Sequence, residues 1–341
     1  MKKLRVLLLT DPRCIPPDDI ATLSPPEQLA YRTEWDVIRT LRASGHEVQP
    51  LGVYDELRPI RQAYDDFKPD IVFNLLEEFA SNTLHGYNVA GFLELLGVPY
   101  TGCNPRGLIL SGEKSLAKKV LIYHRIRVPA FHVYPLGRKV RRPRHLAFPL
   151  IVKSLTEHSS LGISQASLVH SDEELAERVA FVHRRIATDA LVEQFITGRE
   201  LYVGVLGNDR LVALPPRELV FEKAPPDAPV IATARAKHNL EYQQRHGIEQ
   251  RAADALPNGL DLALLRLSKR IYKILGLTGY ARLDYRLSPD GQLWFLEANP
   301  NPELADGEEF ASAARAHGLS YPELLERILR LGLSAAGPRD A

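Results

Sequence analysis

Cysteine is scarce in this chain of 341 residues, which contains only Cys14 and Cys103. Two isolated cysteines are too few for a disulfide framework, and their separation does not fit the paired spacing of a structural zinc site. We therefore expect two free thiols.

An excess of charge and long apolar runs are also missing. The 43 Lys and Arg nearly cancel the 42 Asp and Glu, so no global field favours nucleic acid or a membrane surface as a partner. No run approaches the roughly 18 apolar residues of a membrane span. The short apolar run after Lys3 meets Thr10-Asp11-Pro12 without a small-residue cleavage site, which favours a buried strand over a signal peptide. We expect a cytoplasmic protein.

The amino-terminal part alternates apolar strands with amphipathic helices, which predicts a parallel α/β sheet. The expected strands cover residues 4–10 and 69–76, with another that begins at 46–48, and the expected helices cover 28–44, 55–67 and 86–96. In the helix 28–44, we expect an inward stripe made of Leu29, Trp35, Val37, Ile38 and Leu41.

Ligands of such sheets lie beyond the carboxyl ends of the strands. This rule selects polar residues after the first and third strands, namely Asp11, Arg13, Glu77, Glu78, Asn82 and His85. A solvated, proline-rich loop is an equally good interpretation of these positions.

From Ser111 onward the pattern changes to a helix followed by antiparallel-looking strands around 130–134, 149–154 and 191–195. A small, hydroxyl-rich loop lies between Lys153 and Ile163. Backbone N–H groups of such a loop can cover a triphosphate, and Lys153 supplies a point charge. An ordinary polar loop is the alternative. A strand edge after 191–195 could offer backbone groups to an adenine ring, with Glu200 reaching a ribose hydroxyl, although a plain hairpin also fits.

Residues 280–302 predict a β-hairpin, because two alternating apolar runs flank the turn Ser288-Pro289-Asp290-Gly291. With a period of two, Arg282 and Asp284 share one face of the first strand. Glu297 and Asn299 share one face of the second. Oxygen ligands of this kind suit Mg²⁺, and the arginine could stabilise developing negative charge. The alternative is a polar, solvated face.

Taken in order, these segments resemble the D-alanine–D-alanine ligases of the ATP-grasp superfamily over nearly the whole chain. The motifs that carry the resemblance are Leu95-Leu96-Gly97-Val98-Pro99-Tyr100-Thr101-Gly102, Lys114, Phe148-Pro149-Leu150-Ile151-Val152-Lys153 with Ser159-Ser160-Leu161-Gly162-Ile163, Glu193-Gln194-Phe195-Ile196 with Gly198 and Glu200, Ala236-Lys237, Arg282-x-Asp284, and Leu296-Glu297-Ala298-Asn299.

The resemblance implies an ATP-grasp fold of class α/β, α+β overall, in which a parallel amino-terminal domain precedes two α+β domains that sandwich ATP. The expected boundaries are 1–110 for the amino-terminal domain, 111–195 for the central domain with the phosphate-covering loop, 196–333 for the carboxy-terminal domain with the metal site, and 334–341 for a flexible tail. It also implies a homodimer.

The resemblance further implies the chemistry. ATP phosphorylates a carboxylate, and an amine attacks the resulting acyl phosphate. Mg²⁺, with Mn²⁺ able to replace it, would lie on Asp284, Glu297 and Asn299. The implied catalytic residues are Arg282, Lys153 and Lys237. The implied nucleotide contacts are Lys114, Lys153, Ser159, Ser160, Gly162, Glu193, Phe195, Ile196, Glu200 and Lys237.

The chain departs from the family in its amino-acid half. After the metal asparagine the ligases have Ser-Pro-Gly-Met and then Ser-Leu, where this chain has Asn301-Pro302-Glu303-Leu304 and Glu308-Glu309. The Glu-Val-Ser motif is absent, Glu77-Glu78 replace a His-Gly, and glycine is missing from the first half of the phosphate loop.

These departures predict a diverged site for small-molecule substrates, with contacts from Glu77, His85, Glu303 and Glu308. Like-charge repulsion predicts that D-alanine is a poor acceptor and that a cationic or amine-rich acceptor is preferred. Two alternatives are a genuine D-alanine–D-alanine ligase and a non-catalytic nucleotide-binding regulator or scaffold. The complete set of Lys, Arg and metal residues speaks against the second.

Overall fold

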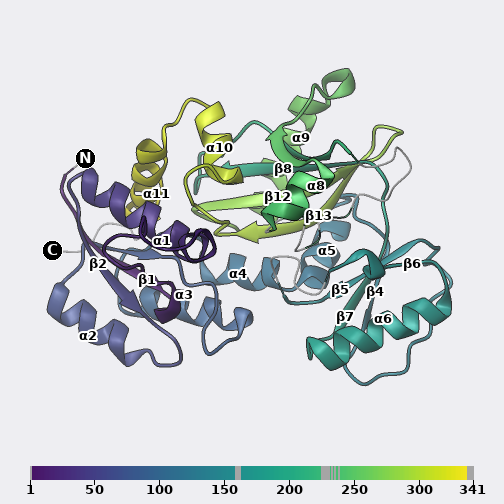
Figure 1. The fold of residues 1–341 in the computed structure, drawn as a ribbon, viewed down its shortest axis with the longest axis horizontal. Coiled ribbons are helices and arrows are strands. Elements are labelled where there is room, and N and C mark those ends of the chain that lie inside the picture. Colours follow the sequence, from purple (N-terminus) through teal and green to yellow (C-terminus); the bar gives the residue numbers. More distant parts are fainter. Residues whose placement is uncertain are drawn as a thin grey trace.

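The computed structural model describes residues 2–157, 163–223 and 239–335, together with residues 231, 233 and 236. The strands of this part of the chain form three sheets, one parallel and two antiparallel, with helices packed against them (Figure 1). The predicted α/β organisation is therefore confirmed. Of the predicted site residues, Ser159, Ser160, Gly162 and Lys237 lie outside the described residues, as does most of the predicted tail.

The amino-terminal sheet is parallel, in the order β2-β1-β3. Its strands are β1 (Arg5–Thr10), β2 (Glu47–Gly52) and β3 (Ile71–Asn74). Side chains of β1 alternate between two cores. Leu7 and Leu9 pack with residues of α2 (Arg58–Phe67) and α3 (Gly86–Leu95), whereas Val6 and Leu8 pack with residues of α1 (Pro25–Ala43) and α11 (Tyr321–Ala335).

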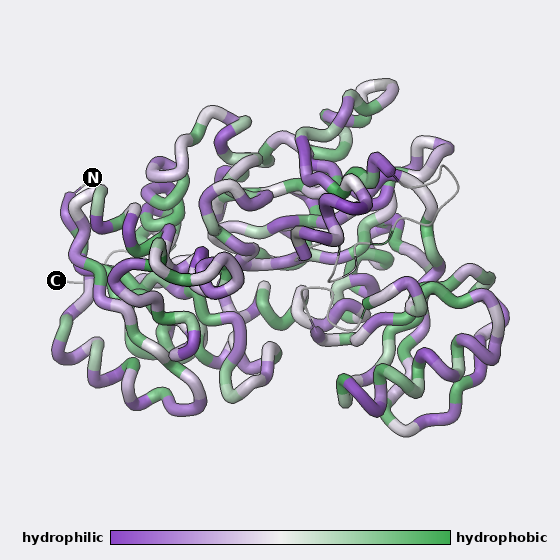
Figure 2. Tube along the Cα trace, viewed as in Figure 1, coloured by the Kyte–Doolittle hydropathy of each residue, from purple (hydrophilic) through white to green (hydrophobic). Residues whose placement is uncertain are grey.

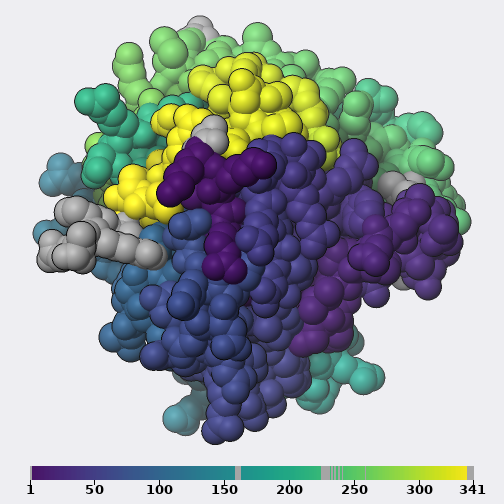
Figure 3. Space-filling view, turned by 90° about the vertical axis from the view of Figure 1, so that its left-hand side faces the viewer, coloured from purple at the N-terminus to yellow at the C-terminus, as the bar shows by residue number. Residues whose placement is uncertain are grey.

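The last helix, α11, therefore completes the core of the first sheet. Figure 3 shows residues near the end of the described chain, in yellow, beside residues near its beginning, in purple. A buried histidine joins them. His46 Nδ1 accepts from the Leu4 backbone N–H at 3.1 Å, so its Nε2 carries a hydrogen and donates to Glu326 Oε1 at 2.8 Å. The orientation of the first sheet is thus fixed by residues at the far end of the sequence.

Helix α1 begins at Pro25, three residues before the predicted start, because Ser24 and Glu27 form a capping box. The prediction that Leu29 points inward is wrong, since 45% of this residue is exposed. The buried stripe is instead Glu34, Val37, Ile38 and Leu41. Leu29 lies five residues before Glu34, a spacing that places it away from this stripe on a helix of 3.6 residues per turn.

The central sheet is antiparallel, in the order β4-β7-β5-β6. It consists of β4 (Phe131–Tyr134), β5 (Leu150–Ser154), β6 (Leu168–Val169) and β7 (Ala190–Gln194). Helix α6 (Asp172–Arg185) packs against it and is capped by Ser171, whose hydroxyl accepts from the Glu174 N–H. Green and purple segments alternate along α6 in Figure 2, as expected of a helix with one face on a sheet.

The third sheet has the order β11-β10-β8-β12-β13, with β9 paired to β8. Its strands are β8 (Arg199–Leu206), β9 (Val212–Ala213), β10 (Arg217–Phe221), β11 (Ile248–Ala252), β12 (Tyr280–Leu287) and β13 (Leu293–Pro300). Apolar side chains of one face, including Leu201, Val203 and Leu283, join the core that contains α9 (Leu260–Ile274). Because side chains alternate, the opposite face carries Glu200, Tyr202 and Asp284.

The remaining helices connect these layers or cover their edges. They are α4 (Pro105–Gly112), α5 (Lys114–Tyr123), α8 (Leu240–His246) and α10 (Glu309–Ala316). Cys14 and Cys103 are free thiols, as predicted. Among the helices of the described residues, none combines the length and the hydropathy that crossing a membrane requires.

Candidate functional site

The β12–β13 hairpin brings the four residues predicted for the metal site together. Arg282 is paired with Asn299 across the two strands, and Asp284 is paired with Glu297. An irregularity in the pairing lies between Asp284 and Tyr285, immediately after the second pair, so it leaves both pairs in register. All four side chains therefore lie on the polar face of the third sheet.

Arg282 and Asp284 form the centre of this group. The guanidinium donates twice to the carboxylate, from Nε at 2.7 Å and from Nη2 at 2.9 Å, and Asn299 Nδ2 donates to Asp284 Oδ2 at 3.0 Å. Arg282 Nη1 also donates to Glu309 Oε2 at 3.0 Å. Burial alone would lower the pKa of Arg282, but the two carboxylates outweigh it and raise the pKa, so the guanidinium stays charged.

Three oxygen-bearing side chains are the candidate metal ligands. Asp284 and Glu297 contribute carboxylates, and Asn299, whose amide nitrogen donates to Asp284, contributes an amide oxygen. Among the described residues, no three His, Cys, Asp or Glu gather into a self-sufficient metal site. Two carboxylates and one amide instead fit a hard divalent cation that completes its shell with phosphate and water oxygens.

A second cluster, made of lysines around one glutamate, lies next to the hairpin. Glu193 on β7 is 1% exposed, and its two oxygens lie 2.8 Å from Lys118 Nζ and 2.9 Å from Lys153 Nζ. Desolvation would raise the pKa of Glu193, but the two lysines together outweigh it and hold the pKa below its ordinary value. Glu193 is therefore ionised. We define the lysine cluster as Lys114, Lys118, Lys153 and Glu193.

Lys114 connects the lysine cluster to two other parts of the site. Its Nζ lies 3.9 Å from Glu297 Oε2 and donates to the backbone carbonyl of Glu157 at 2.5 Å. Glu157 is the last described residue before the predicted phosphate-covering loop. The cation of Lys114 thus lies between the loop and the candidate metal ligand.

Lys118 was not predicted from the sequence. It follows Lys114 by four residues on α5, the spacing that places two side chains on one face of a helix, and this signal could have identified it. Besides Glu193, its Nζ contacts the backbone carbonyl of Leu296, the residue before Glu297.

The predicted ribose acid, Glu200, is buried and bonded to two neighbours that the sequence did not indicate. Tyr202 Oη donates to its Oε1 at 2.7 Å, and Arg286 Nη2 lies 2.7 Å from its Oε2. The Arg286 guanidinium carbon also lies 5.6 Å from the centre of the Phe195 ring. Period-two spacing from Arg282 and Asp284 could have placed Arg286 on this face.

Two of the acids predicted to contact substrate, Glu77 and Glu303, interact with a third acid that the sequence did not indicate, Glu34. Glu34 lies on α1, Glu77 follows β3, and Glu303 follows β13. Desolvation raises the pKa of each, and the charges of neighbouring acids raise it further: Glu34 acts on Glu77, and Glu77 acts on Glu303. Thr10 donates to Glu34 at 2.7 Å, and Thr33 donates to Glu303 at 3.3 Å. We define the acid group as Glu34, Glu77 and Glu303.

The other predicted substrate residues lie in different surroundings. Glu308 accepts from Arg32 Nη1 at 3.5 Å, so a cation of the protein lies beside it. His85 ends a 3-10 turn, where its Nε2 is 3.3 Å from Asn82 Nδ2. Within the described residues, His85 makes no hydrogen bond or ion pair with the acid group.

Asn301, which replaces a family residue, has a structural role in this chain. It adopts a left-handed conformation, with φ of 51°, and its Oδ1 accepts from the Cys103 backbone N–H at 2.8 Å. A Cβ added to Gly102 would lie 2.5 Å from that oxygen, so the close approach requires glycine at position 102. This contact fixes the segment after β13 to the segment that joins the first and central domains.

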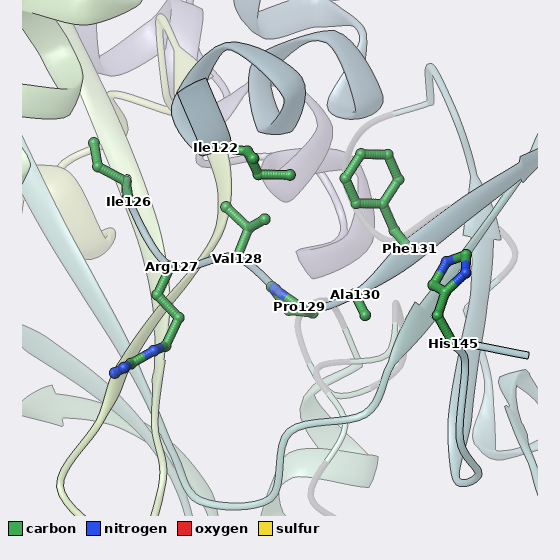
Figure 4. Close-up of a pocket in the computed structure, with 8 residues that line it drawn as sticks. All are labelled: Ile122, Ile126, Arg127, Val128, Pro129, Ala130, Phe131 and His145. Carbon is green, nitrogen blue, oxygen red and sulfur yellow. The ribbon is translucent and has the colours of Figure 1, made fainter. Parts of the chain in front are cut away.

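A cavity of about 440 Å³ lies elsewhere, between the end of α5 and the start of β4 (Figure 4). Its lining is mainly apolar, and Arg127 and His145 are the members that are charged or titratable. The lining residues are Ile122, Ile126, Arg127, Val128, Pro129, Ala130, Phe131 and His145. None of the predicted site residues lines it.

Comparisons with known proteins bear on this geometry. The family model described as "D-ala D-ala ligase C-terminus" matches residues 130–330, more than half of the chain. The D-alanine–D-alanine ligase of Desulforudis audaxviator is 31% identical over 321 residues, which cover 91% of this chain and 95% of that protein. This chain belongs to the D-alanine–D-alanine ligase family. The corresponding enzyme of Bordetella petrii is 34% identical over 244 residues, 70% of this chain and 69% of that protein.

The solved structures agree on the fold. A crystal structure of the Bacillus anthracis D-alanine–D-alanine ligase complexed with ATP has a TM-score of 0.75 at 21% identity and covers 98% of both chains. The predicted ATP-grasp fold is confirmed, and family membership confirms the predicted class of enzyme, an ATP-dependent ligase.

Proposed function

We propose that this protein is an ATP- and Mg²⁺-dependent ligase that joins a carboxylate to an amine through an acyl phosphate, and that its acceptor carries a positive charge. One observation carries the first part of the proposal. Two carboxylates and an amide lie beside a charged arginine and next to a cluster of buried lysines, all on or near the β12–β13 hairpin. This combination suits the transfer of a phosphoryl group better than any single member of it.

The proposed reaction has two steps. An oxygen of the substrate carboxylate bonds to the terminal phosphorus of ATP while the bond to the bridging oxygen breaks, so ADP leaves and an acyl phosphate forms. The acceptor amine then bonds to the carbonyl carbon, inorganic phosphate leaves, and the nitrogen loses a proton. The new bond is an amide.

Different residues of the chain would act in the two steps. Lys114 and Lys153 would neutralise phosphate charge, together with Lys237, which lies outside the described residues. Arg282 would stabilise the oxyanion that forms when the amine attacks. Mg²⁺ bound by the hairpin ligands would supply further charge neutralisation at the phosphates.

Arg282 is held in place before any substrate binds. Its hydrogen bonds to Asp284 and Glu309 fix the plane of the guanidinium, so little reorganisation remains for the reaction itself. Glu309 therefore neutralises Arg282 and does not repel a substrate carboxylate. The acceptor preference then depends on the acid group.

The acid group supports the second part of the proposal. Desolvation is the main cause that raises the pKa values of its members, and the charge of another member of the group raises each pKa further, so the three carboxylates act on one another. A second carboxylate brought to about 4 Å from one of them would meet roughly 1 kcal/mol of repulsion in water and more where solvent is partly excluded. An ammonium group would be attracted by the same amount. The acid group therefore favours an amino acid with a basic side chain, or a diamine.

The alternative is a genuine D-alanine–D-alanine ligase, which the names of the relatives favour. A kinetic comparison separates the two. With D-alanine as the carboxylate donor, kcat/KM is measured for D-alanine, D-lysine, D-ornithine and 1,4-diaminobutane as acceptors. We expect a basic acceptor to exceed D-alanine. A tenfold or greater preference for D-alanine would overturn the cationic acceptor and leave the ligase assignment intact.

Two variants sharpen this experiment. Glu303→Gln removes one charge from the acid group without changing its volume, and we expect about a tenfold fall in kcat/KM for the basic acceptor, the equivalent of roughly 1.4 kcal/mol. Glu308→Gln is the matched control, because Glu308 lies beside Arg32. Equal effects of both variants would count against a specific role for Glu303.

A further inference from the structure

Lys118 is the most deeply buried cation of the lysine cluster. Its side chain is 1% exposed, compared with 14% for Lys153, although both bind the same carboxylate. Lys118 Nζ also contacts the Leu296 carbonyl and lies 5.7 Å from the centre of the Phe295 ring. Its ammonium group is therefore surrounded by β7 on one side and β13 on the other.

This arrangement gives one carboxylate two cations of unequal freedom. Glu193 Oε1 is bound by Lys118 and Oε2 by Lys153. Lys153 lies at the end of β5, where the predicted phosphate-covering loop begins, and part of its side chain reaches solvent. The Lys118 side chain has no comparable access to solvent, because α5, β7 and β13 enclose it.

Binding of a triphosphate would affect the two lysines differently. Phosphate oxygens attract an ammonium group strongly, so Lys153 would turn from Glu193 toward them. A carboxylate left without a partner in a buried site is costly. Something must continue to neutralise Glu193 after Lys153 has moved.

We propose that Lys118 is a positioning residue, the fixed counter-ion that holds Glu193 ionised and in place when Lys153 turns toward the phosphates of ATP. This inference rests on the proposed function, since it requires ATP at this site. Glu193 Oε2 would then be free to accept a hydrogen bond from the exocyclic amino group of adenine, while Oε1 stays on Lys118. The same Nζ holds the Leu296 carbonyl, so the group that fixes the base-reading carboxylate also fixes the strand that carries Glu297.

The consequence is specific to the base. Without Lys118, the position of Glu193 would be lost, and with it the ability to distinguish adenine from a base that lacks the amino group. A purely structural role would weaken the binding of all nucleotides alike. The ratio of kcat/KM for ATP to that for inosine triphosphate therefore separates the two roles.

The test compares Lys118→Met with Lys119→Met, the same substitution at the next position of α5, where the side chain is exposed. ADP release is measured with ATP and with inosine triphosphate, with D-alanine as the substrate. We expect Lys118→Met to lower the ATP preference about tenfold or more, mainly through KM, and Lys119→Met to leave it unchanged. An unchanged preference in Lys118→Met would overturn the inference.

A second measurement uses the unaltered protein, in case Lys118→Met does not fold. A crystal structure with Mg²⁺ and the non-hydrolysable analogue AMP-PNP should show Lys118 still on Glu193 and Lys153 on the phosphates. Lys153 remaining on Glu193 would overturn the inference while leaving the proposed function intact. The nucleotide bound away from Glu193 and Lys153 would overturn both.

Discussion

Glu193→Gln should destabilise the protein severely. The substitution keeps the volume of the side chain but removes the anion that pairs with both Lys118 and Lys153, leaving two buried lysines without their nearest counter-charge. Breaking a buried ion pair by removal of one partner costs about 3–5 kcal/mol. Because whole domains are stable by only about 5–15 kcal/mol, we expect a large shift of the urea midpoint.

An exposed ion pair of the same length provides the control. Arg61 Nε lies 2.8 Å from Asp65 Oδ2 on α2, and more than half of each side chain is exposed. Asp65→Asn should therefore cost less than about 1 kcal/mol. A loss of similar size in the two variants would refute the view that Glu193 is a buried anion that neutralises two lysines.

The pH dependence of Glu193→Gln provides an independent check. Desolvation already lowers the pKa of Lys118 from its ordinary 10.5, and removal of Glu193 lowers it further. The unfolded variant then binds more protons than the folded variant, so its stability should rise as pH rises from neutrality toward 10.5. Stability that falls or stays constant over that interval would contradict the sign of this effect.

Three further predictions concern the site. Glu297→Gln should keep the fold but lower turnover by about a hundredfold or more even at saturating Mg²⁺, since a charged ligand is lost, and near-normal steady-state rates would contradict its role. Lys153→Ala should weaken ATP binding, measured by calorimetry, and slow phosphoryl transfer, measured by single-turnover kinetics. An unchanged ATP affinity together with an unchanged single-turnover rate would contradict this role of Lys153. Desolvation, followed by the charge of Glu77, raises the pKa of Glu303, so the folded state binds more protons than the unfolded state. The stability of the protein should therefore rise as pH falls toward 4.5, and this rise should be smaller in Glu303→Gln. Melting temperatures that fall equally in both proteins would disprove this.

The sequence predicted the parts of the site that depend on short-range order. Alternation and an Asp-Gly turn predicted the hairpin, and the structure pairs Arg282 with Asn299 and Asp284 with Glu297. Apolar runs and capping residues located most strands and helices to within a few residues. These features succeed because they depend on neighbours within one or two turns of the chain.

Contacts between distant segments could not be predicted in the same way. Nothing in the local pattern indicates that α11 completes the core of the first sheet, or that Glu326 accepts from His46. The partner of Glu309 was also not predictable. The sequence suggested an added acid beside the substrate, whereas in the structure Glu309 accepts a hydrogen bond from Arg282. In each case the partner lies far away in the sequence, so only the tertiary fold decides what a charge contacts.

The central claim, ligation through an acyl phosphate, is tested most directly by following the carboxylate oxygens. D-alanine labelled with oxygen-18 at both carboxylate oxygens is incubated with the protein, ATP, Mg²⁺ and the preferred acceptor. The proposed mechanism predicts that each amide bond formed releases one inorganic phosphate carrying one labelled oxygen, together with ADP. Unlabelled phosphate accompanying amide formation would contradict it.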